Sequence, residues 1–235
     1  MSIKAFIHLA AVPMRKEPSD KSEMVNQAIY GESCSIIDEN EKWYLIELAH
    51  DGYQGWIDKK QVKLSDNYIQ PSTVQIELLS SLPNTTEQPQ LIPAGAFVMG
   101  SPAPKAPSLL DSAKAFLKSP YLWGGRTCLG IDCSGFTQIV FRICGKSLLR
   151  DAYQQAEQGE IVSFLDEAKT GDLAFFDNTD GRITHVGIII SDDNGSFKSI
   201  IHASGEVRID SLDTEGIYNK DQEKYTHRLR TIRRV

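Results

Sequence analysis

The sequence predicts an α+β fold, in which a small β-barrel precedes a larger domain that has helices first and an antiparallel sheet after them. Three observations support this prediction. Up to about residue 66 the chain has short strand segments separated by turn residues, with no helical period. From residue 108 apolar residues recur at helical spacing in two segments, and strand segments follow from residue 171. The predicted domains are 1–66, 67–107 and 108–235.

Composition sets limits on the function. The chain has 235 residues, with 25 Lys and Arg against 31 Asp and Glu, a formal net charge of −6. That balance lacks the basic footprint of a nucleic-acid-binding protein. No segment approaches the roughly 20 apolar residues that span a bilayer, and the N-terminal apolar run is short for a secretory signal. We therefore predict a cytoplasmic monomer without nucleic-acid or membrane partners, with export to the cell envelope as the alternative.

The N-terminal domain carries its strand signals in short phrases. Residues 5–15, AFIHLAAVPMR, read as a first strand, and KWYLIELA is a strand rich in bulky side chains. Two glycines between aromatics follow in HDGYQGWID. The phrases VPMRKEPS, GESCSIIDEN, WYLIEL and YQGWI resemble bacterial SH3-like domains. This resemblance implies that the predicted barrel is an SH3-like one.

Residues 67–107 hold seven of the ten prolines of the chain. TVQIELLS and AGAFVMG have strand character, and SSLPNTTEQPQ reads as a loop between them. The Ile, Leu and Val content is too high for a wholly flexible segment. Two interpretations remain open here: a second, degenerate SH3-like unit, or a structured linker.

The third domain begins with helix signals. Ser108 is a good N-cap for a helix whose apolar residues include Leu109, Ala113 and Phe116. A second helix starts at about Cys133, and Gly145 ends it. DAYQQAEQG reads as a short third helix.

Strand segments make up the remainder of this domain. GDLAFFD, ITHVGIIIS and SFKSIIHAS are predicted strands, with a DDNG turn between the last two. The tail HRLRTIRRV alternates basic and apolar residues, which indicates a closing strand.

Cys133 has the position of a nucleophile. In the first turn of a helix the backbone N–H groups have no partner within the helix, and the helix dipole places partial positive charge there. Such a site favours the thiolate. We therefore expect a lowered pKa for Cys133, while Cys34 and Cys144 have core positions and Cys128 lies in the preceding loop.

Two histidines supply the predicted base and the group that orients it. His185 interrupts an apolar strand and His202 lies in the next one, 202 − 185 = 17 residues later. On a hairpin the two rings would be close, so that one fixes the tautomer of the other. A single histidine in an apolar strand is more often a core residue with a hydrogen-bonded ring than a catalytic one. Zinc bound by Cys133, His185 and His202 with a further cysteine is disfavoured, because the spacing lacks a close ligand pair, and we predict neither a metal nor a cofactor.

The motifs together resemble a known family. YLWGG, GIDCSGF, GDLAFF, THVGIII and IHASG are similar in sequence and order to the NlpC-type cell-wall peptidases, which are papain-like cysteine hydrolases. The resemblance implies Cys133 as nucleophile, His185 as general base and acid, and His202 as the orienting third member. It also implies that Tyr121 assists the oxyanion site.

A narrower resemblance concerns the substrate. An SH3-like unit ahead of such a domain, with RDAYQQ after the nucleophile helix, is similar to γ-D-glutamyl-L-diamino acid endopeptidases, which cut murein peptides that have a free N-terminal L-Ala. In that group an aspartate at the position of Asp151 binds the ammonium group; the alternative is that it only caps a helix. A serine often follows it, so Ala152 leaves one hydrogen bond in doubt. The remaining predicted substrate contacts are Ser134, Trp123 and Tyr53, with Trp56 as second choice for Tyr53 and barrel core as its alternative role.

The predicted function is therefore hydrolysis of the γ-D-Glu–diamino acid bond of a murein tripeptide or tetrapeptide, in the recycling of cell-wall peptides. Two alternatives remain open. One is an amidase on the same scaffold that cuts at the sugar–peptide bond, and the other is a peptidoglycan-binding module without activity. The sequence leaves open whether the diamino acid is Lys or diaminopimelate.

Overall fold

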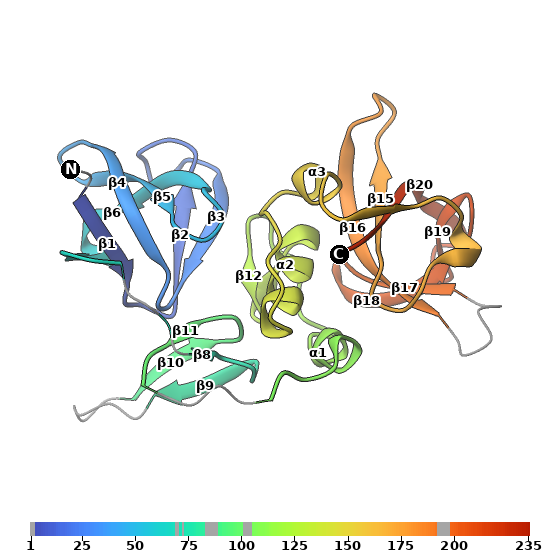
Figure 1. The fold of residues 1–235 in the computed structure, drawn as a ribbon. Helices are drawn as coiled ribbons and strands as arrows, with labels where there is room; N and C mark the ends of the chain where they lie inside the picture. The colour runs from blue at the N-terminus through green and yellow to red at the C-terminus, as the bar shows by residue number, and fades with distance from the viewer. Residues whose placement is uncertain (1–2, 69–70, 72, 83–88, 101–104, 192–197) are drawn as a thin grey trace. The chain divides into compact units, whose positions relative to one another are not determined.

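The computed structural model describes residues 3–68, 71, 73–82, 89–100, 105–191 and 198–235. The chain forms two compact units. The first comprises the described residues up to Ala106 together with Leu122–Ile131, and the second comprises Pro107–Tyr121 with Asp132–Val235. Each unit has its own sheet and core (Figure 1).

The first unit is built on a seven-stranded antiparallel sheet in the order β3-β2-β6-β5-β4-β1-β7. Its alternating strands enclose an apolar core that includes Ile7, Met14, Ile46 and Leu48. The strands are β1 (Ile3–Ile7), β2 (Ala11–Arg15), β3 (Met24–Ile29), β4 (Ser33–Glu39), β5 (Trp43–Leu48), β6 (Gln54–Asp58) and β7 (Val62–Ser65), with a 3-10 turn at Lys59–Gln61. The predicted strand-rich SH3-like domain is confirmed.

Residues 5–15 form two strands, and the prediction of one continuous strand is wrong. β1 pairs with β4 and β7, whereas β2 pairs with β3 and β6. The chain thus changes partners between Ile7 and Ala11. Gly31 closes this region, because its N–H donates to the Ile7 carbonyl at 2.9 Å. Its φ of +81° and the nearby Phe97 carbonyl exclude a side chain there.

The described part of 67–106 is structured and lies in the first unit, and the second unit begins at Pro107. β9 (Leu79–Leu82) pairs with β10 (Gln90–Pro93), and β8 (Thr73–Val74) pairs with β11 (Phe97–Val98). These ribbons share a small core of Ile92, Ala96 and Val98 with Tyr30. Most of the predicted loop SSLPNTTEQPQ lies outside the described residues.

The segment Leu122–Ile131 belongs to the first unit, although the predicted boundary placed it with the third domain. It contains the short strands β12 (Arg126–Thr127) and β13 (Gly130–Ile131). The buried Arg126 guanidinium donates to both carboxylate oxygens of Glu32, at 2.9 and 3.0 Å, and to the Gln27 carbonyl at 2.8 Å. A buried charge on this loop is therefore neutralised by a residue almost a hundred positions earlier.

The second unit has helices ahead of an antiparallel sheet, as predicted. The helices are α1 (Leu109–Ala115), α2 (Cys133–Ile143) and α3 (Ala152–Gln155), with a 3-10 turn at Leu165–Glu167. The strands are β14 (Glu160–Val162), β15 (Leu173–Asp177), β16 (Ile183–Ser191), β17 (Lys198–Ser204), β18 (Glu206–Leu212), β19 (Gly216–Asn219) and β20 (Lys224–Arg234). The predicted turn between β16 and β17 falls on residues 192–197, outside the described residues.

Six strands of the second unit close on themselves. β15 to β19 follow one another in the sheet, and β20 pairs with both β15 and β19. Phe176, Ile189, Ile200 and Ile217 fill the core of this sheet. All of α2 is buried, and Phe136 of α2 meets Phe116 edge-on at 5.9 Å between ring centroids. α2 therefore packs against α1 as well as against β16.

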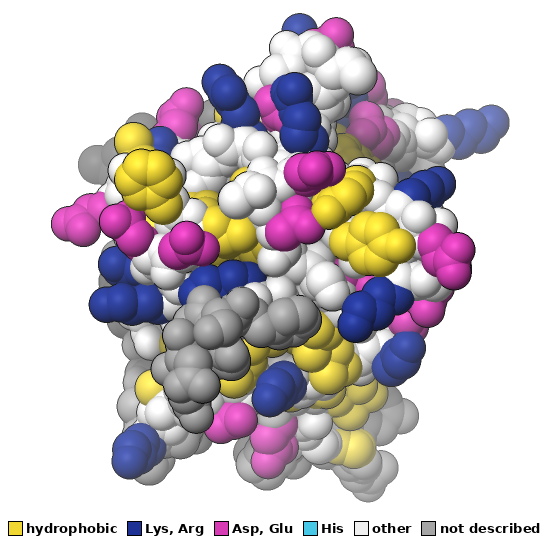
Figure 2. All heavy atoms as spheres, turned by 90° about the vertical axis from the view of Figure 1, so that its right-hand side faces the viewer, with side chains coloured by type: hydrophobic (Ala, Val, Ile, Leu, Met, Phe, Trp, Pro, Cys, Tyr) yellow, Lys and Arg dark blue, Asp and Glu magenta, His cyan; other side chains and the backbone are white. Residues whose placement is uncertain are grey.

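The surface carries charges of both signs. On the face in Figure 2, Lys and Arg side chains alternate with Asp and Glu side chains around scattered apolar ones. In the described part of the chain no helix has the length and apolar character needed to span a membrane.

Candidate active site

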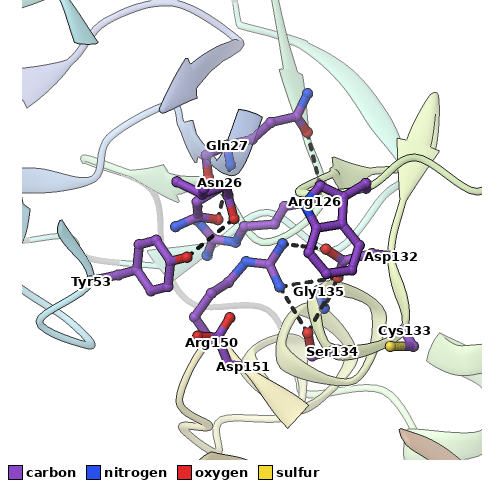
Figure 3. A network of polar contacts seen from close by, with 12 residues as sticks. Asn26, Gln27, Tyr53, Arg126, Asp132, Cys133, Ser134, Gly135, Arg150 and Asp151 are labelled. Atoms are coloured by element: carbon purple, nitrogen blue, oxygen red, sulfur yellow. Dashed lines mark hydrogen bonds and ion pairs between the residues drawn. The ribbon is translucent and has the colours of Figure 1, made fainter. Parts of the chain in front are cut away.

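Cys133 is the first residue of α2, as predicted. The helix begins here because the Asp132 side chain caps it, accepting the Gly135 N–H at 2.7 Å. Arg150 holds the cap in place, donating to both Asp132 oxygens at 2.6 and 3.0 Å and to the Ser134 hydroxyl at 2.9 Å (Figure 3). The start of the helix is therefore fixed on both sides of the cysteine.

The Cys133 sulfur lies against strand β16. Its Sγ is 4.0 Å from the Thr184 carbonyl oxygen, and the backbone N–H groups of Val186 and Ser134 are directed at it. His185 lies between Thr184 and Val186 in the strand. The fold thus brings the predicted nucleophile to the strand that carries the predicted base.

The expected lowering of the Cys133 pKa does not occur in this structure. Burial, followed by the negative charge of Asp132, raises the pKa of the Cys133 thiol to about 12. The N–H groups of Val186 and Ser134 and the Arg150 charge act in the opposite direction but are outweighed. The helix N-terminus is present, but the loss of solvent around the sulfur dominates. Burial in this structure therefore favours the neutral thiol over the thiolate.

The two predicted histidines meet across β16 and β17. His185 Nε2 and His202 Nδ1 are 2.8 Å apart. Gly187 permits this approach, because it lies opposite His202 and a Cβ on it would be 2.8 Å from the His202 Cβ. Both rings are buried, with exposed fractions of 6% and 1%. The predicted pairing of the two imidazoles is present.

Two further residues complete the histidine cluster, and the sequence analysis missed both. Asp210 Oδ2 lies 3.0 Å from His202 Nε2. His227 stacks on His185, with 4.1 Å between ring centroids and 25° between planes. Burial, followed by the charges of His202 and His227, holds the pKa of His185 well below its usual value. Burial and the charge of His202 lower the pKa of His227 to about 4.

Tyr121 lies close enough to the nucleophile to interact with its charge. Burial and the negative charges of Cys133 and Asp132 raise the pKa of the Tyr121 hydroxyl. The Tyr121 N–H donates to the Gly205 carbonyl at 2.9 Å. The hydroxyl therefore remains a protonated donor throughout the physiological range.

Asp151 is the N-cap of α3, the alternative role that the sequence allowed. Its backbone N–H donates to the Gln154 side chain at 3.1 Å in a capping box. Gln155 joins α3 to α2, donating to the Ser134 carbonyl at 3.0 Å, and Ala152 is buried. The role of Asp151 as an ammonium-binding residue stays a prediction.

Tyr53 and Trp123 lie in the first unit. Tyr53 is partly buried against the barrel core, and its hydroxyl donates to the Val25 carbonyl at 3.3 Å. Trp123 is 58% exposed and donates through Nε1 to Glu23 at 2.8 Å. Their contacts with substrate, and those of Trp56 and Ser134, stay predictions.

Comparison with family models adds to this geometry. Residues 118–227 match the model of the NlpC/P60 family, and residues 14–62 match that of the bacterial dipeptidyl-peptidase SH3 domain. Residues 118–227 form an NlpC/P60 domain. The predicted family resemblance, with an SH3 domain ahead of the catalytic one, is confirmed.

The chain is similar in sequence to two curated proteins and in structure to a solved one. A γ-D-glutamyl-L-lysine dipeptidyl-peptidase of Bacillus cereus is 27% identical over 84% of this chain and 73% of its own length. One of Bacillus subtilis is 39% identical over 49% of this chain and 38% of its own length. A crystal structure of an NlpC/P60 family protein from Bacillus cereus superposes with a TM-score of 0.77 at 21% identity, over 98% of this chain and 99% of that one. Residues 118–227 thus match the NlpC/P60 family, and the two Bacillus relatives that the chain resembles are named as peptidases.

A cavity of about 1040 Å³ lies next to the histidine cluster of the NlpC/P60 domain. Its lining includes His227, Thr184, Glu215 and Tyr225. Thr184 is also the residue whose carbonyl faces the Cys133 sulfur. The cavity thus adjoins the histidine cluster through His227 and the surroundings of the sulfur through Thr184.

All four cysteines are free thiols. Burial, with the charge of Glu32, raises the pKa of Cys34 to about 12. Cys144 lies 3.7 Å from the Pro107 carbonyl, and Cys128 lies 3.5 Å from that of Leu78. Across the described ranges, no three His, Cys, Asp or Glu side chains group closely enough to hold a metal ion.

Proposed function

We propose that this chain is an endopeptidase that hydrolyses the bond between γ-D-Glu and a diamino acid in murein peptides with a free N-terminal L-Ala. The observation that carries the proposal is the hydrogen-bonded row His185–His202 beside the helix-capped Cys133. The names of the relatives from the two Bacillus species support the choice of bond. A role in recycling soluble cell-wall peptides follows from this substrate.

The first chemical step joins Cys133 to the substrate. His185 Nε2 is engaged with His202, which leaves Nδ1 to accept the thiol proton. The sulfur forms a bond to the γ-carbonyl carbon while the carbonyl electron pair moves to oxygen. The Cys133 N–H and the Tyr121 hydroxyl stabilise the resulting oxyanion.

The second step releases the amine and then the acid. The C–N bond breaks and the His185 proton goes to the departing amino group, which leaves a thioester on Cys133. Water attacks the thioester with His185 as base, giving the free γ-carboxylate and restoring the thiol. A neutral thiol beside a neutral imidazole suits this cycle, because the proton moves only when the sulfur attacks.

Substrate recognition in this proposal depends on the Asp151 carboxylate. A charge-assisted hydrogen bond to the substrate ammonium selects a free N-terminus. Asp151 is half-buried at the start of α3, which Gln155 ties to the helix that carries the nucleophile. One side chain can thus cap the helix and bind the substrate.

The nucleophile is tested by Cys133→Ala, with Cys144→Ala, at the other end of the same helix, as the matched control. Both proteins are incubated with L-Ala-γ-D-Glu-L-Lys, and the products are identified by mass spectrometry. We expect no L-Ala-D-Glu from Cys133→Ala and normal release from Cys144→Ala. Turnover by Cys133→Ala would refute the proposal.

The bond and the substrate class are tested with three substrates. We expect cleavage of the free tripeptide, a large increase in KM when its N-terminus is acetylated, and little release from whole sacculi. Asp151→Asn should weaken discrimination between the free and acetylated peptides. If muropeptides lose their sugar instead, the amidase alternative is correct.

A further inference from the structure

We propose that Asp210, held by Arg208, is a positioning residue that fixes the tautomer of His202 and thereby keeps His185 able to accept the thiol proton. The inference rests on the proposed function, in which His185 is the base. It concerns a residue outside the predicted triad that reaches the base only through another side chain.

The contacts form a continuous row inside the second unit. His202 Nδ1 faces His185 Nε2 at 2.8 Å, and His202 Nε2 faces Asp210 Oδ2 at 3.0 Å. Arg208 donates to both Asp210 oxygens, through Nε at 2.8 Å and Nη2 at 2.9 Å. His202 and Asp210 are 1% and 6% exposed. Solvent therefore has little influence on where the proton on His202 lies.

The Asp210 carboxylate decides between two arrangements of the protons on His185 and His202. Only one hydrogen can lie between His185 and His202. If it belongs to His185, then His202 carries its own proton on Nε2, and His185 Nδ1 is bare and can accept a proton. If it belongs to His202, then His185 carries its proton on Nδ1 and is not a base toward Cys133.

An ionised carboxylate can only accept a hydrogen bond. With both rings neutral, it therefore requires the His202 proton on Nε2, which selects the first arrangement. In the second arrangement, a bare Nε2 would face the Asp210 oxygen without a hydrogen. Asp210 thus determines, two rings away, that the base is in its active tautomer.

Arg208 keeps Asp210 in that state. Its bidentate contact orients the carboxylate, and Nη2 also reaches the exposed Asp221 at 2.8 Å. Burial alone would raise the pKa of Asp210, but the hydrogen bonds from His202 and Arg208 bring it below the usual value. Asp210 is thus charged throughout the neutral range.

The experiment reads the tautomer by ¹⁵N NMR on histidine-labelled protein at neutral pH. The chain has five histidines, so the spectrum can be assigned with single substitutions. We expect His202 to be protonated on Nε2 in the wild type and to become a mixture of tautomers in Asp210→Asn, because an amide can donate or accept. Asp221→Asn is the matched control: it removes the other carboxylate on Arg208 and should leave the tautomer unchanged.

Kinetics of the same variants give the second readout. For Asp210→Asn we expect kcat to fall about 10- to 100-fold with KM unchanged, less than the roughly 10⁴-fold loss when an aspartate that contacts the base itself becomes Asn. Asp221→Asn should retain wild-type kcat. An unchanged kcat in a folded Asp210→Asn, or a loss without a change of tautomer, would overturn the proposal.

Two outcomes separate this inference from the proposed function. The NMR measurement needs no activity, so it decides the inference even if the substrate is wrong. Wild-type His202 protonated on Nδ1 would overturn it even if Asp210→Asn does not fold. Turnover by Cys133→Ala would instead refute the proposed function and leave the tautomer result standing.

Discussion

In each unit a buried arginine contacts a buried carboxylate, and these two pairs do different things. In the first unit Arg126 and Glu32 have side chains that are both 0% exposed. In the second unit Arg150 and Asp132 are 1% and 7% exposed. Both contacts are bidentate. The chemistry of recognition is the same in both places.

The difference lies in what else the carboxylate holds. Glu32 accepts a hydrogen bond from the Ile29 N–H, in the turn between β3 and β4. Asp132 caps α2, whose first residue is the predicted nucleophile. A buried ion pair is therefore structural or functional according to its neighbours, and the following experiments are designed to test that distinction.

The largest effect is expected for Arg150→Met. Removing one partner of a buried pair should lower the free energy of unfolding by about 3–5 kcal/mol. It should also release the cap at Cys133 and lower kcat roughly 100-fold, the order of loss from a small misplacement of reacting groups. Urea unfolding and steady-state kinetics measure the two effects. Wild-type kcat in the folded variant would remove the functional distinction between the pairs.

Arg126→Met should cost a similar 3–5 kcal/mol of unfolding free energy but leave kcat nearly unchanged. The free energy of unfolding falls because the Glu32 carboxylate would remain buried without the guanidinium. The double variant Arg126→Met/Glu32→Gln removes the charge and keeps an acceptor for Ile29, so it should recover part of the loss. A fall in kcat as large as that of Arg150→Met would show that both pairs serve catalysis.

Acid should weaken the second unit first. The pKa of His227 is lowered to about 4 from 6.5, so between these values the unfolded chain binds a proton that the folded one does not, and stability falls as pH drops. The shift corresponds to about 3 kcal/mol, lost progressively from pH 6.5 to 4. Urea titrations at several pH values should show this loss, and His227→Phe should flatten it. A pH-independent wild type would contradict the prediction.

Asp51 should weaken the first unit at more acid pH. Burial alone would raise the pKa of Asp51, but His50 and Arg126 bring it below its usual value of 3.8. Its contribution to stability is therefore present above pH 3.8 and lost below it. Trp43 and Trp56 lie in the first unit. As the pH is lowered, their fluorescence should change at a lower pH than that at which protonation of His227 reduces stability.

The smallest effects are expected at helix caps. Ser108 caps α1 and accepts the Asp111 N–H at 3.1 Å, so Ser108→Ala should lower the unfolding free energy by about 1 kcal/mol. Asp58 in the first unit caps only a 3-10 turn of three residues, and Asp58→Ala should cost less. Thermal unfolding resolves the difference, and a larger loss for Asp58→Ala would reverse the expected order.

Local signals made much of the site predictable. Helical spacing of apolar residues predicted the helix that starts at about Cys133, because periodicity is a property of neighbouring residues. His185 and His202 could be paired because a hairpin brings nearby strands together. The order of helices and strands in the second unit followed from the same patterns.

Longer-range features could not be predicted in this way. His227 comes from the last strand, and only closure of the sheet places it on His185. Asp210 is one of many acidic residues, and only the register of β17 with β18 aims it at His202. The Cys133 pKa depends on how completely the fold removes water, which spacing does not reveal.

The crossing of the segment Leu122–Ile131 into the first unit has a consequence for biosynthesis. The chain passes between the units three times, after Ala106, Tyr121 and Ile131. Glu32 must therefore wait for its arginine until more than half of the polypeptide has left the ribosome. A gene truncated to start at Pro107 would encode Arg126 without Glu32, so the guanidinium would lose the carboxylate that neutralises it in the folded protein.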